Sequence, residues 1–289
     1  MVWGKLMQKT LKKYFPVFIL PTFIAFLIAF LIPFVMGVYL SFTEFTTVSN
    51  ARWVGLKNYL QIFAANSDFL NALWFTVKFT VVSVITVNIL AFALALLLTR
   101  GIRGTNFFRT VFFMPNLIGG IVLGYIWQLI INGVLRGLGV DITFSASYGF
   151  WGLVVLTNWQ LIGYMMIIYI AGLQNVPHEF IEAARIDGAG SFQILRHITI
   201  PTVMPSITIC TFLSLTGAFK LFDQNLALTA GQPFGKTEML ALNIYNTFYA
   251  RAGAQWKGLG QAKAVIFCIL VIAISLIQLK ATRSKEVQQ

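Results

Sequence analysis

Residues 73–98 read LWFTVKFTVVSVITVNILAFALALLL, and Lys78 is the one charged side chain in this run. A helix needs about 20 mostly apolar residues to cross the hydrocarbon core of a bilayer. The run is long enough for such a crossing, and it is apolar over its whole length. It therefore predicts a transmembrane helix.

The rest of the chain and its composition agree with this prediction. Hydrophobic residues make up 58% of the 289 residues, charged residues make up 10%, and the mean hydropathy is +0.79. Soluble domains carry about 25% charged residues, so the natural solvent of this chain is lipid. We expect an all-α, polytopic membrane protein with six transmembrane helices. They are predicted at about residues 16–42, 73–98, 111–131, 150–173, 202–222 and 262–280.

The N-terminal segment resembles a signal peptide because lysines precede the first apolar run. The run at 16–42 is longer than the apolar region of a signal peptide, and no small-residue cleavage site follows it. We therefore predict a retained span. The membrane domain would occupy residues 16–280, with cytoplasmic segments at 1–15 and 281–289. The N-terminal lysines are Lys5, Lys9, Lys12 and Lys13.

The positive charge predicts the orientation of the chain. The short connection at 99–110 contains Arg100, Arg103 and Arg109 and no acidic residue. Loops on the cytoplasmic side are enriched in Lys and Arg. We expect both termini to lie in the cytoplasm of a bacterial cytoplasmic (inner) membrane. The net charge of +12 is then a consequence of topology, so we predict no nucleic-acid partner.

The loop between the fourth and fifth predicted spans is helical in pattern. Residues 177–201 read PHEFIEAARIDGAGSFQILRHITIP. Pro177 suits the first position of a helix, where its missing N–H costs nothing, and Gly188 can adopt the positive φ that ends one. The pattern predicts a short cytoplasmic helix over 178–187 and a second one over 191–197.

Two interpretations of the first short helix are possible on physical grounds. Phe180, Ile181 and Ala184 lie near one face, so the helix could dock into a groove on another protein. It could instead lie on lipid headgroups. Its acidic residues disfavour the second interpretation, because the inner membrane surface is anionic. These acids are Glu179, Glu182 and Asp187.

This loop also resembles a known motif. Glu182-Ala183-Ala184, followed by Asp187-Gly188 and by the ending ITIP at 198–201, is similar to the EAA loop of permeases in binding-protein-dependent ABC importers. Ile200 stands where Leu is usual. The resemblance implies that the loop forms a coupling helix which contacts an ATPase. The coupling residues would be Glu182, Ala183, Ala184, Asp187 and Gly188.

Other segments resemble the sugar-type, or carbohydrate-uptake, subgroup of these permeases. The resemblance extends over about residues 16–280. Arg136 departs from it, since the subgroup often has Asn near this position. The segments that carry the resemblance are WVGLKNY at 53–59, RTVFFMP at 109–115, Trp127, LTAGQP at 228–233 and TEMLALNIY at 237–245.

The resemblance implies a set of partners and a mechanism. A second permease subunit would complete the pathway, and the subgroup suggests a distinct paralogue, although an identical copy remains open. Two cytoplasmic ATPase subunits would each receive one coupling helix. An extracytoplasmic binding protein would deliver the sugar. The chain itself would be no enzyme and would bind no cofactor, because ATP and Mg belong to the ATPase subunits.

The remaining motifs predict neither catalysis nor a metal site. Residues 230–237 fit a relaxed P-loop pattern, but they fall on the predicted outer side, where there is no ATP. His178 and His197 lack the spacing of metal ligands. Gly120 and Gly124 form a Gly-x-x-x-Gly motif, which lets helices approach closely in lipid. We expect it to serve packing within the bundle and not self-dimerisation.

A sugar site needs hydrogen-bonding side chains and aromatic platforms. Trp at the end of a span is also typical of an interfacial anchor, and the partner permease is an alternative place for the site. Lys78 and Lys220 either extend outward to the interface or line the pathway. The candidate substrate-binding residues are Asn158, Trp159, Gln160, Tyr164, Trp127, Gln128, Asp223 and Asn225.

Two functions are compatible with a helical membrane bundle. The favoured one is the permease subunit of an ATP-driven importer of a sugar or oligosaccharide. The alternative is a self-contained secondary transporter or channel for a small polar solute. Ion-coupled carriers usually place charged relays inside the membrane, and these spans carry almost none away from their ends. A requirement of uptake for ATP would distinguish the two.

Overall fold

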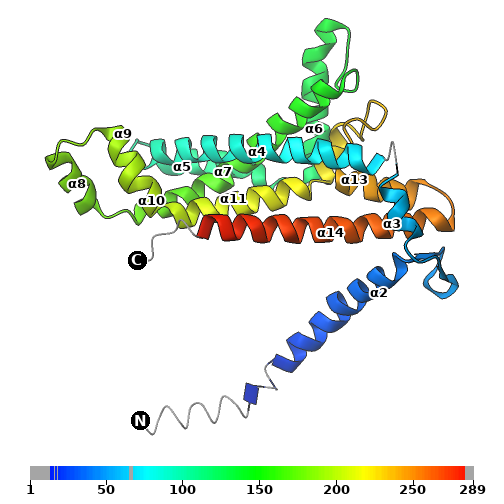
Figure 1. Ribbon diagram of the computed structural model, residues 1–289. Helices are drawn as coiled ribbons and strands as arrows, with labels where there is room; N and C mark the ends of the chain where they lie inside the picture. Colours follow the sequence, from blue (N-terminus) through cyan, green and yellow to red (C-terminus); the bar gives the residue numbers. More distant parts are fainter. Residues whose placement is uncertain (1–13, 16, 18, 65–67, 284–289) are drawn as a thin grey trace. The chain divides into compact units, whose positions relative to one another are not determined.

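The computed structural model describes residues 14–15, 17, 19–64 and 68–283 (Figure 1). The described part is helical apart from one small hairpin, which confirms the predicted all-α class. Within it, five helices are long and apolar enough to cross a membrane, and a bent pair gives a sixth candidate. The five are Ile19–Leu40, Asp68–Leu98, Gly120–Leu138, Ala146–Gln174 and Ala254–Thr282. The predicted terminal segments 1–15 and 281–289 lie largely outside the described residues.

The chain divides into two compact units. The first contains residues 1–62 and 247–266. Its first helix, Ile19–Leu40, includes a π-helical turn, η1 (Leu27–Leu31), that continues into α2 (Ile32–Leu40). A hairpin and a short helix follow, and the first half of α14 belongs to the same unit. These elements are β1 (Thr43–Glu44), η2 (Val48–Asn50), β2 (Arg52–Trp53), α3 (Lys57–Ile62) and α14 (Ala254–Arg283).

The hairpin of the first unit is held by local contacts. Strands β1 and β2 are antiparallel, with Thr43 opposite Trp53. The Asn58 side chain donates to the carbonyl oxygens of Ser41 and Thr43, at 2.9 and 3.0 Å. Gly258 of α14 lies against the same strand, because a Cβ there would fall 1.9 Å from the Thr43 oxygen. The absence of a side chain at Gly258 therefore lets α14 approach the hairpin.

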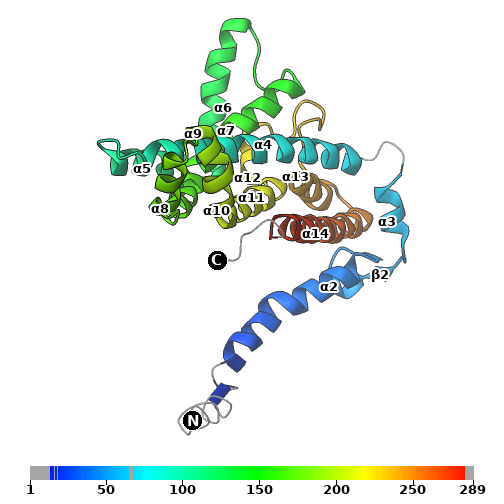
Figure 2. The ribbon, with the colours of Figure 1, turned by 60° about the vertical axis from the view of Figure 1, so that its left-hand side comes forward.

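The second unit, residues 63–246 and 267–289, contains the main helical bundle. Helix α4 (Asp68–Leu98) packs along α7 (Ala146–Gln174), and α11 (Met204–Phe219) packs on both, as Figures 1 and 2 show. Helix α7 is apolar on nearly all sides, as expected of a helix in the middle of a membrane bundle. Ser206 of α11 reaches so close to Gly172 that a Cβ there would be 2.3 Å from its hydroxyl oxygen.

The predicted third span at 111–131 does not form one helix. Helix α5 (Thr105–Phe113) ends in a 3₁₀ turn, η3 (Met114–Leu117), and α6 (Gly120–Leu135) then takes a different direction (Figure 1). Pro115 lies inside the turn, where it lacks a donor and clashes with the preceding turn of an α-helix. The apolar run continues through this break, so hydropathy alone places the span too early.

The predicted fifth span at 202–222 begins at a sharp bend in the chain. The helical segment Ser191–Thr202 meets Met204–Phe219 at an angle of 71°. Val203 lies at the break, between Pro201 and Pro205. Proline inside a helix removes a hydrogen bond and kinks the chain. The straight part of the span therefore begins at Met204 and ends at Phe219, and α12 (Asp223–Leu228) is a separate short helix.

The length of α4 bears on the two interpretations of Lys78. Measured from Leu98, beside the arginines of the 99–110 connection, about 30 Å of hydrocarbon corresponds to about 20 residues of helix. Lys78 therefore lies near the boundary of the bilayer core opposite to Leu98. Its ammonium group is 5.5 Å from the centre of the Trp74 ring, and both side chains are exposed. This position favours extension outward to the interface.

Candidate coupling loop and pathway site

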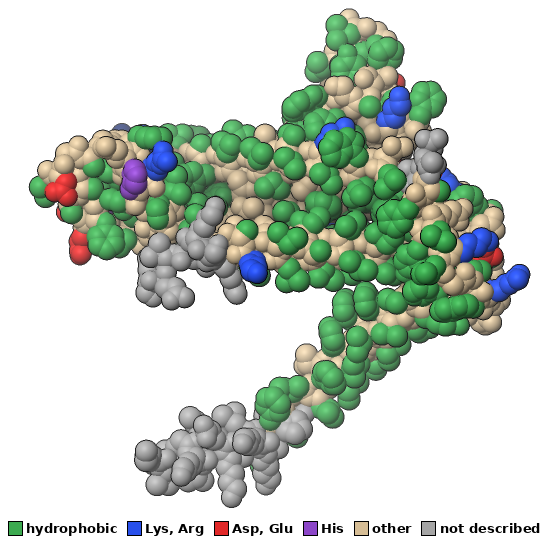
Figure 3. All heavy atoms as spheres, in the orientation of Figure 1, with side chains coloured by type: hydrophobic (Ala, Val, Ile, Leu, Met, Phe, Trp, Pro, Cys, Tyr) green, Lys and Arg blue, Asp and Glu red, His purple; other side chains and the backbone are tan. Residues whose placement is uncertain are grey.

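The first short helix of the loop forms as predicted. Helix α8 (His178–Ile186) lies at one end of the second unit, and Figure 3 shows acidic side chains gathered there. Pro177 is the residue that precedes the helix, with φ −63° and ψ 127°, one position earlier than predicted. Its missing N–H is still not needed by the helix. Glu179 lies in the first turn, where the helix dipole favours an acid.

Gly188 ends the helix by a specific hydrogen-bonded turn. Its φ is +80°, and its N–H donates to the Arg185 carbonyl at 3.1 Å. The next N–H, of Ala189, donates to the Ala184 carbonyl at 2.9 Å. This pair of bonds is the Schellman arrangement. The predicted helix 178–187 therefore ends at Ile186, because Asp187 already forms its C-cap.

The side chains of α8 separate into an inner and an outer set. Ile181 packs against the core cluster that includes Leu98 and Val176. The sequence pattern suggested that Ile181 and Phe180 share an exposed face, and this prediction is wrong. Phe180 is 57% exposed and Ile186 is 86% exposed. The outer surface of α8 thus presents two large apolar side chains, whereas its inner side is attached to the bundle.

A second helical segment faces α8 and is consistent with the predicted helix over 191–197. It starts as α9 (Ser191–Ile194) and continues as a π-helical stretch, η5 (Leu195–Thr199). The Gln193 side chain accepts from the Gly190 N–H at 2.7 Å, and the His197 ring nitrogen Nδ1 lies 3.0 Å from the Gln193 carbonyl oxygen. These contacts fix the start of α9.

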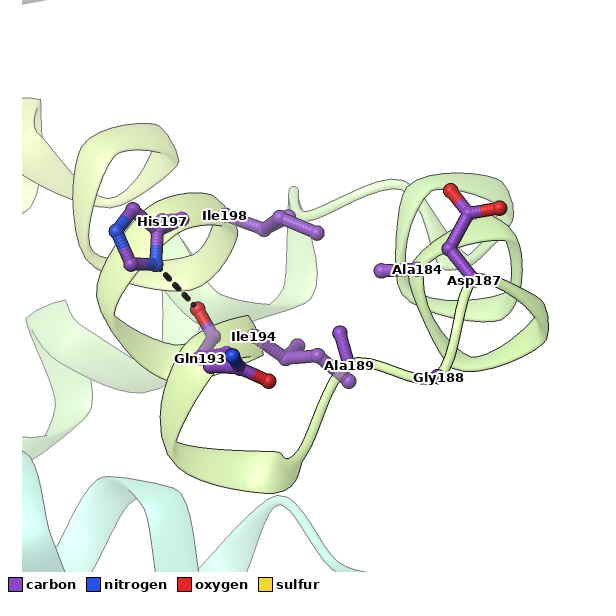
Figure 4. A pocket seen from close by; sticks show the side chains of 8 residues that line it. All are labelled: Ala184, Asp187, Gly188, Ala189, Gln193, Ile194, His197 and Ile198. Atoms are coloured by element: carbon purple, nitrogen blue, oxygen red, sulfur yellow. Dashed lines mark hydrogen bonds between the residues drawn. The ribbon is translucent and has the colours of Figure 1, made fainter.

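The two segments enclose a groove of about 340 Å³ (Figure 4). Ile194 and Ile198 point from the second segment toward α8, and Ala184 points back from α8. The small Ala184 side chain of the EAA pattern therefore leaves open space between the two segments. The groove is lined by Ala184, Asp187, Gly188, Ala189, Gln193, Ile194, His197 and Ile198.

Three helices bring some of the predicted sugar-binding residues together. Trp127 of α6 and Trp159 of α7 meet edge to face, with ring centres 5.6 Å apart, and Trp159 is 44% exposed. Gln160 of α7 accepts a hydrogen bond of 2.8 Å from Gln224 of α12. Gln128 donates to the Leu228 carbonyl at 3.0 Å. The arrangement combines an aromatic platform with amide groups, as a sugar site requires.

Two other predicted sugar-binding residues are buried and form structural hydrogen bonds, so they are not exposed to a ligand. Asn158 is buried and donates to the Thr86 hydroxyl of α4 at 2.9 Å. Asn225 is fully buried. Its amide donates to the Thr237 carbonyl at 2.8 Å, and its side-chain oxygen accepts from the Met239 N–H at 3.0 Å. These asparagines hold helices and a loop together, so a sugar would have to displace structural bonds to reach them.

The last two candidates lie to either side of this arrangement. Tyr164 is half-buried, and its ring centre is 6.4 Å from that of Phe113 in α5. Asp223 is exposed at the start of α12 and lines a cavity of about 280 Å³ together with Lys220. The polar end of the fifth predicted span therefore includes an acidic and a basic side chain at one cavity.

Sequence reasoning missed two polar features. Gln224 is not among the predicted site residues, although its neighbours in sequence are. A second feature lies deeper in the bundle, where the Tyr169 hydroxyl donates to Asn88 at 2.7 Å and the Asn88 amide donates to the Ser214 hydroxyl at 2.9 Å. It links α7, α4 and α11. A polar residue in the middle of each apolar run is the signal that could have identified it.

The Gly-x-x-x-Gly motif packs two helices of the same chain, as predicted. A Cβ on Gly124 would lie 2.5 Å from the Ala227 methyl carbon of α12, and one on Gly120 would lie 2.8 Å from the Asp223 Cβ. Helix α12 therefore sits directly on the glycine face of α6. This contact positions Gln224 beside Gln160.

The relaxed P-loop pattern at 230–237 uses its backbone donors internally. The Gln232 N–H donates to the Thr229 carbonyl at 2.8 Å, and the Lys236 N–H donates to the Pro233 carbonyl at 2.9 Å. Thr237 is fully buried, and its hydroxyl donates to the Gln232 carbonyl at 2.6 Å. A phosphate cradle needs N–H groups that converge on a ligand, whereas these are paired within the loop.

These features define a multi-pass α-helical membrane protein with a helical hairpin at one end of its bundle. Residues 103–282 match the model of a family described as "binding-protein-dependent transport system inner membrane component". The matched region contains α8, the groove and the candidate pathway helices. The chain belongs to this family.

Comparisons with individual proteins agree over nearly the whole chain. It is 43% identical to the probable starch degradation products transport system permease protein AmyD of Thermoanaerobacterium thermosulfurigenes, over 94% of each chain. It is 31% identical to the multiple sugar-binding transport system permease protein MsmF of Streptococcus mutans, over 97% of this chain and 99% of that one. The fold also resembles a chain of a bacterial alginate ABC transporter, solved in complex with an alginate pentasaccharide-bound periplasmic protein. That likeness has a TM-score of 0.78 and 19% identity, and it covers 96% of each chain.

Membership in this family decides between the two functions left open by composition. The predicted resemblance to importer permeases is confirmed, and the chain is a permease component of binding-protein-dependent transport. The alternative function, a self-contained secondary transporter or channel, is therefore rejected.

Proposed function

We propose that this chain is the membrane permease subunit of an ATP-driven importer that takes up sugars or oligosaccharides. The names of its relatives refer to starch degradation products and to multiple sugars, and the structural neighbour was solved with a sugar-loaded periplasmic protein. The substrate would arrive on such a binding protein at the outer face. A second permease subunit, of related but distinct sequence, would complete the pathway.

Helix α8 would act as the coupling helix, in contact with a cytoplasmic ATPase subunit that holds ATP and Mg²⁺. The observation that carries this proposal is the outer surface of α8. Phe180 and Ile186 are largely exposed on a helix that also carries Glu182. Large apolar side chains on a short, charged helix suit insertion into a groove on another protein. The small Ala183 side chain would let the helix approach the groove closely.

Motion of α8 would be transmitted to the pathway by packing. Ile181 attaches α8 to the cluster that includes Leu98 at the end of α4 and Val203 at the bend before α11. The hydrogen-bonded turn at Gly188 sets the direction of the following segment. A displacement of α8 would therefore move the inner ends of these helices together, with both termini on the same cytoplasmic side.

The sugar would contact the aromatic pair and the amides of α6, α7 and α12. Trp127 and Trp159 would supply a stacking surface for the apolar face of a sugar ring. Gln128, Gln160 and Gln224 would supply donors and acceptors for its hydroxyl groups. These side chains presently bond one another or a backbone carbonyl, so they would exchange these bonds for bonds to the sugar.

Charge reversal on α8 tests the proposed coupling. In proteoliposomes that contain the complete transporter, Glu182→Lys should abolish sugar uptake and the stimulation of ATP hydrolysis by loaded binding protein. The exposed position of Glu182 means that the subunit should still fold and insert. Gln174→Lys adds positive charge at the exposed end of α7, outside α8, and should leave uptake unchanged. Normal uptake by Glu182→Lys would exclude the assigned role.

A further inference from the structure

Helix α3, in the loop after the first span, has three distinct faces. Leu56 is the turn residue directly before α3, and the Leu60 N–H donates to its carbonyl at 3.0 Å. The Leu56 and Leu60 side chains are 62% and 73% exposed. Gln61 is also exposed, but it lies about 100° beyond Leu60. Asn58 and Ile62 are each 1% exposed and form the buried face. The exposed surface of α3 is thus divided into an apolar stripe and a polar stripe.

The buried face fixes the direction in which the apolar stripe points. Asn58 donates two hydrogen bonds to backbone carbonyls around the start of β1. Lys57 forms an ion pair of 2.8 Å with Glu44 in the same strand, and the Tyr59 hydroxyl lies 2.6 Å from that of Ser41. Because the hairpin holds α3 on this side, the two leucines cannot turn inward without breaking these contacts.

Trp53, three residues before Leu56 in the chain, packs against the end of a membrane span. The Trp53 ring lies 5.9 Å from Tyr39, in the last turn of α2, and stacks on Phe42 at 5.4 Å. Trp53 and Tyr39 are 60% and 52% exposed. The span Ile19–Leu40 contains 22 residues, about 33 Å of helix against a hydrocarbon core of about 30 Å. Tyr39 therefore lies at the boundary of this core, the depth at which Trp and Tyr are enriched.

We propose that α3 and Trp53 form an interfacial anchor seated in the outer leaflet of the bilayer. Leu56 and Leu60 would lie among the upper parts of the acyl chains. Lys57 and Gln61 would face headgroups and water. This division of apolar and polar side chains is that of a helix which lies in the interface plane. The anchor would hold the outer end of the first span at a constant depth.

Lipid is a better partner for the apolar stripe than a soluble protein that binds only transiently. A soluble binding protein would cover the leucines only while docked, and they would be exposed to water in the rest of the cycle, which is unfavourable for apolar surface. Leu56 instead follows Trp53 by three residues, and Trp53 packs on aromatic residues at the end of α2, which already lie at the membrane boundary.

Nitroxide labels test the depth of each stripe. Leu56→Cys, Leu60→Cys and Gln61→Cys are made in a Cys268→Ser background, where the remaining Cys210 is buried. The complete transporter is placed in nanodiscs of phosphatidylethanolamine and phosphatidylglycerol. Collision of each label with oxygen, which concentrates in lipid, is compared with collision with a water-soluble nickel chelate. The ratio of oxygen to nickel collisions should be several-fold higher at 56 and 60 than at 61.

The two leucine positions give independent readouts, so a folding defect in one variant leaves the other. High nickel accessibility at 56 and 60 would show that the stripe faces water. Protection from both reagents would show that a protein surface covers it. Either result would overturn the proposal. The measurement needs only insertion into a bilayer, so it is independent of whether α8 couples to an ATPase.

Discussion

Position 188 requires glycine because of its backbone conformation, and not because a side chain would collide with a neighbour. A Cβ at this position would meet no described atom within 4 Å, but φ is +80°. An L-residue with a side chain adopts this conformation at a cost of about 1–2 kcal/mol. The cost falls on the turn that joins α8 to the rest of the loop.

Replacement of Gly188 should therefore weaken coupling more than folding. Gly188→Ala should lower the number of sugar molecules transported per ATP hydrolysed, because the turn no longer holds one direction. Gly188→Asn should recover part of the loss, since Asn tolerates positive φ better than Ala. Gly133→Ala is the control, because Gly133 lies inside α6 with φ outside the positive range and no described neighbour within 4 Å of a Cβ. Equal coupling in Gly188→Ala and Gly133→Ala would contradict the assigned role of the turn.

Trp159 offers a second test at the scale of one side chain. If it supplies a stacking surface, Trp159→Ala should raise the sugar concentration for half-maximal uptake about tenfold, which corresponds to about 1.4 kcal/mol. Trp74→Ala removes an even more exposed indole near Lys78, outside the candidate site, and should leave this concentration unchanged. Uptake that depends equally on both tryptophans, or on neither, would place the sugar elsewhere.

At the scale of elements, the contact between α6 and α12 positions the amide side chains of the candidate site. Gly124→Leu should separate the two helices, because even a Cβ there would lie 2.5 Å from Ala227. Overpacking of this kind costs about 1–3 kcal/mol. The expected result is a lower Tm of the purified transporter and weaker sugar uptake.

Gly133→Leu is the matched control for this substitution. It introduces the same side chain in the same helix, where a Cβ would meet open space among the described residues. If both variants lowered Tm equally, the effect would come from leucine in α6 and not from contact with α12.

The elements themselves could be predicted from the sequence to different degrees. Apolar runs identify the spans because bilayer thickness sets a minimum length for them. Gly188 identifies the end of α8 because few residues adopt positive φ. The break at Pro115 and the angle of the bend at Val203 were not predicted, since hydropathy reports how apolar a segment is and not its direction. The prolines at both places were the available signal.

The candidate site could be predicted only in part, for a related reason. Helix α7 is apolar on nearly every side, so its sequence does not show which face meets another helix. Asn158 and Trp159 are adjacent in sequence, yet Asn158 turns to α4 and Trp159 remains exposed. Asn225 is committed to its own loop by bonds to residues 237 and 239, more than ten positions away. Such pairings depend on the tertiary fold.

For the whole molecule, the account requires that α8 lies in the cytoplasm and transmits the action of an ATPase to the helices behind it. The arginines of the 99–110 connection favour the cytoplasmic side for this end of the bundle. Ile181 joins α8 to the bundle, and Phe180 and Ile186 remain available to a partner. Coupling then follows from a rigid attachment on one side and a docking surface on the other.

Cross-linking at Ala183 tests this claim most directly. Ala183 is exposed on α8, and Ala183→Cys in a Cys268→Ser background allows a short thiol-reactive cross-linker to be attached there in membranes that carry the whole transporter. We predict a covalent adduct with the ATPase subunit whose yield changes when ATP is bound. No adduct with an ATPase, or reaction of this cysteine with an impermeant reagent applied to the outer face of intact cells, would contradict the account.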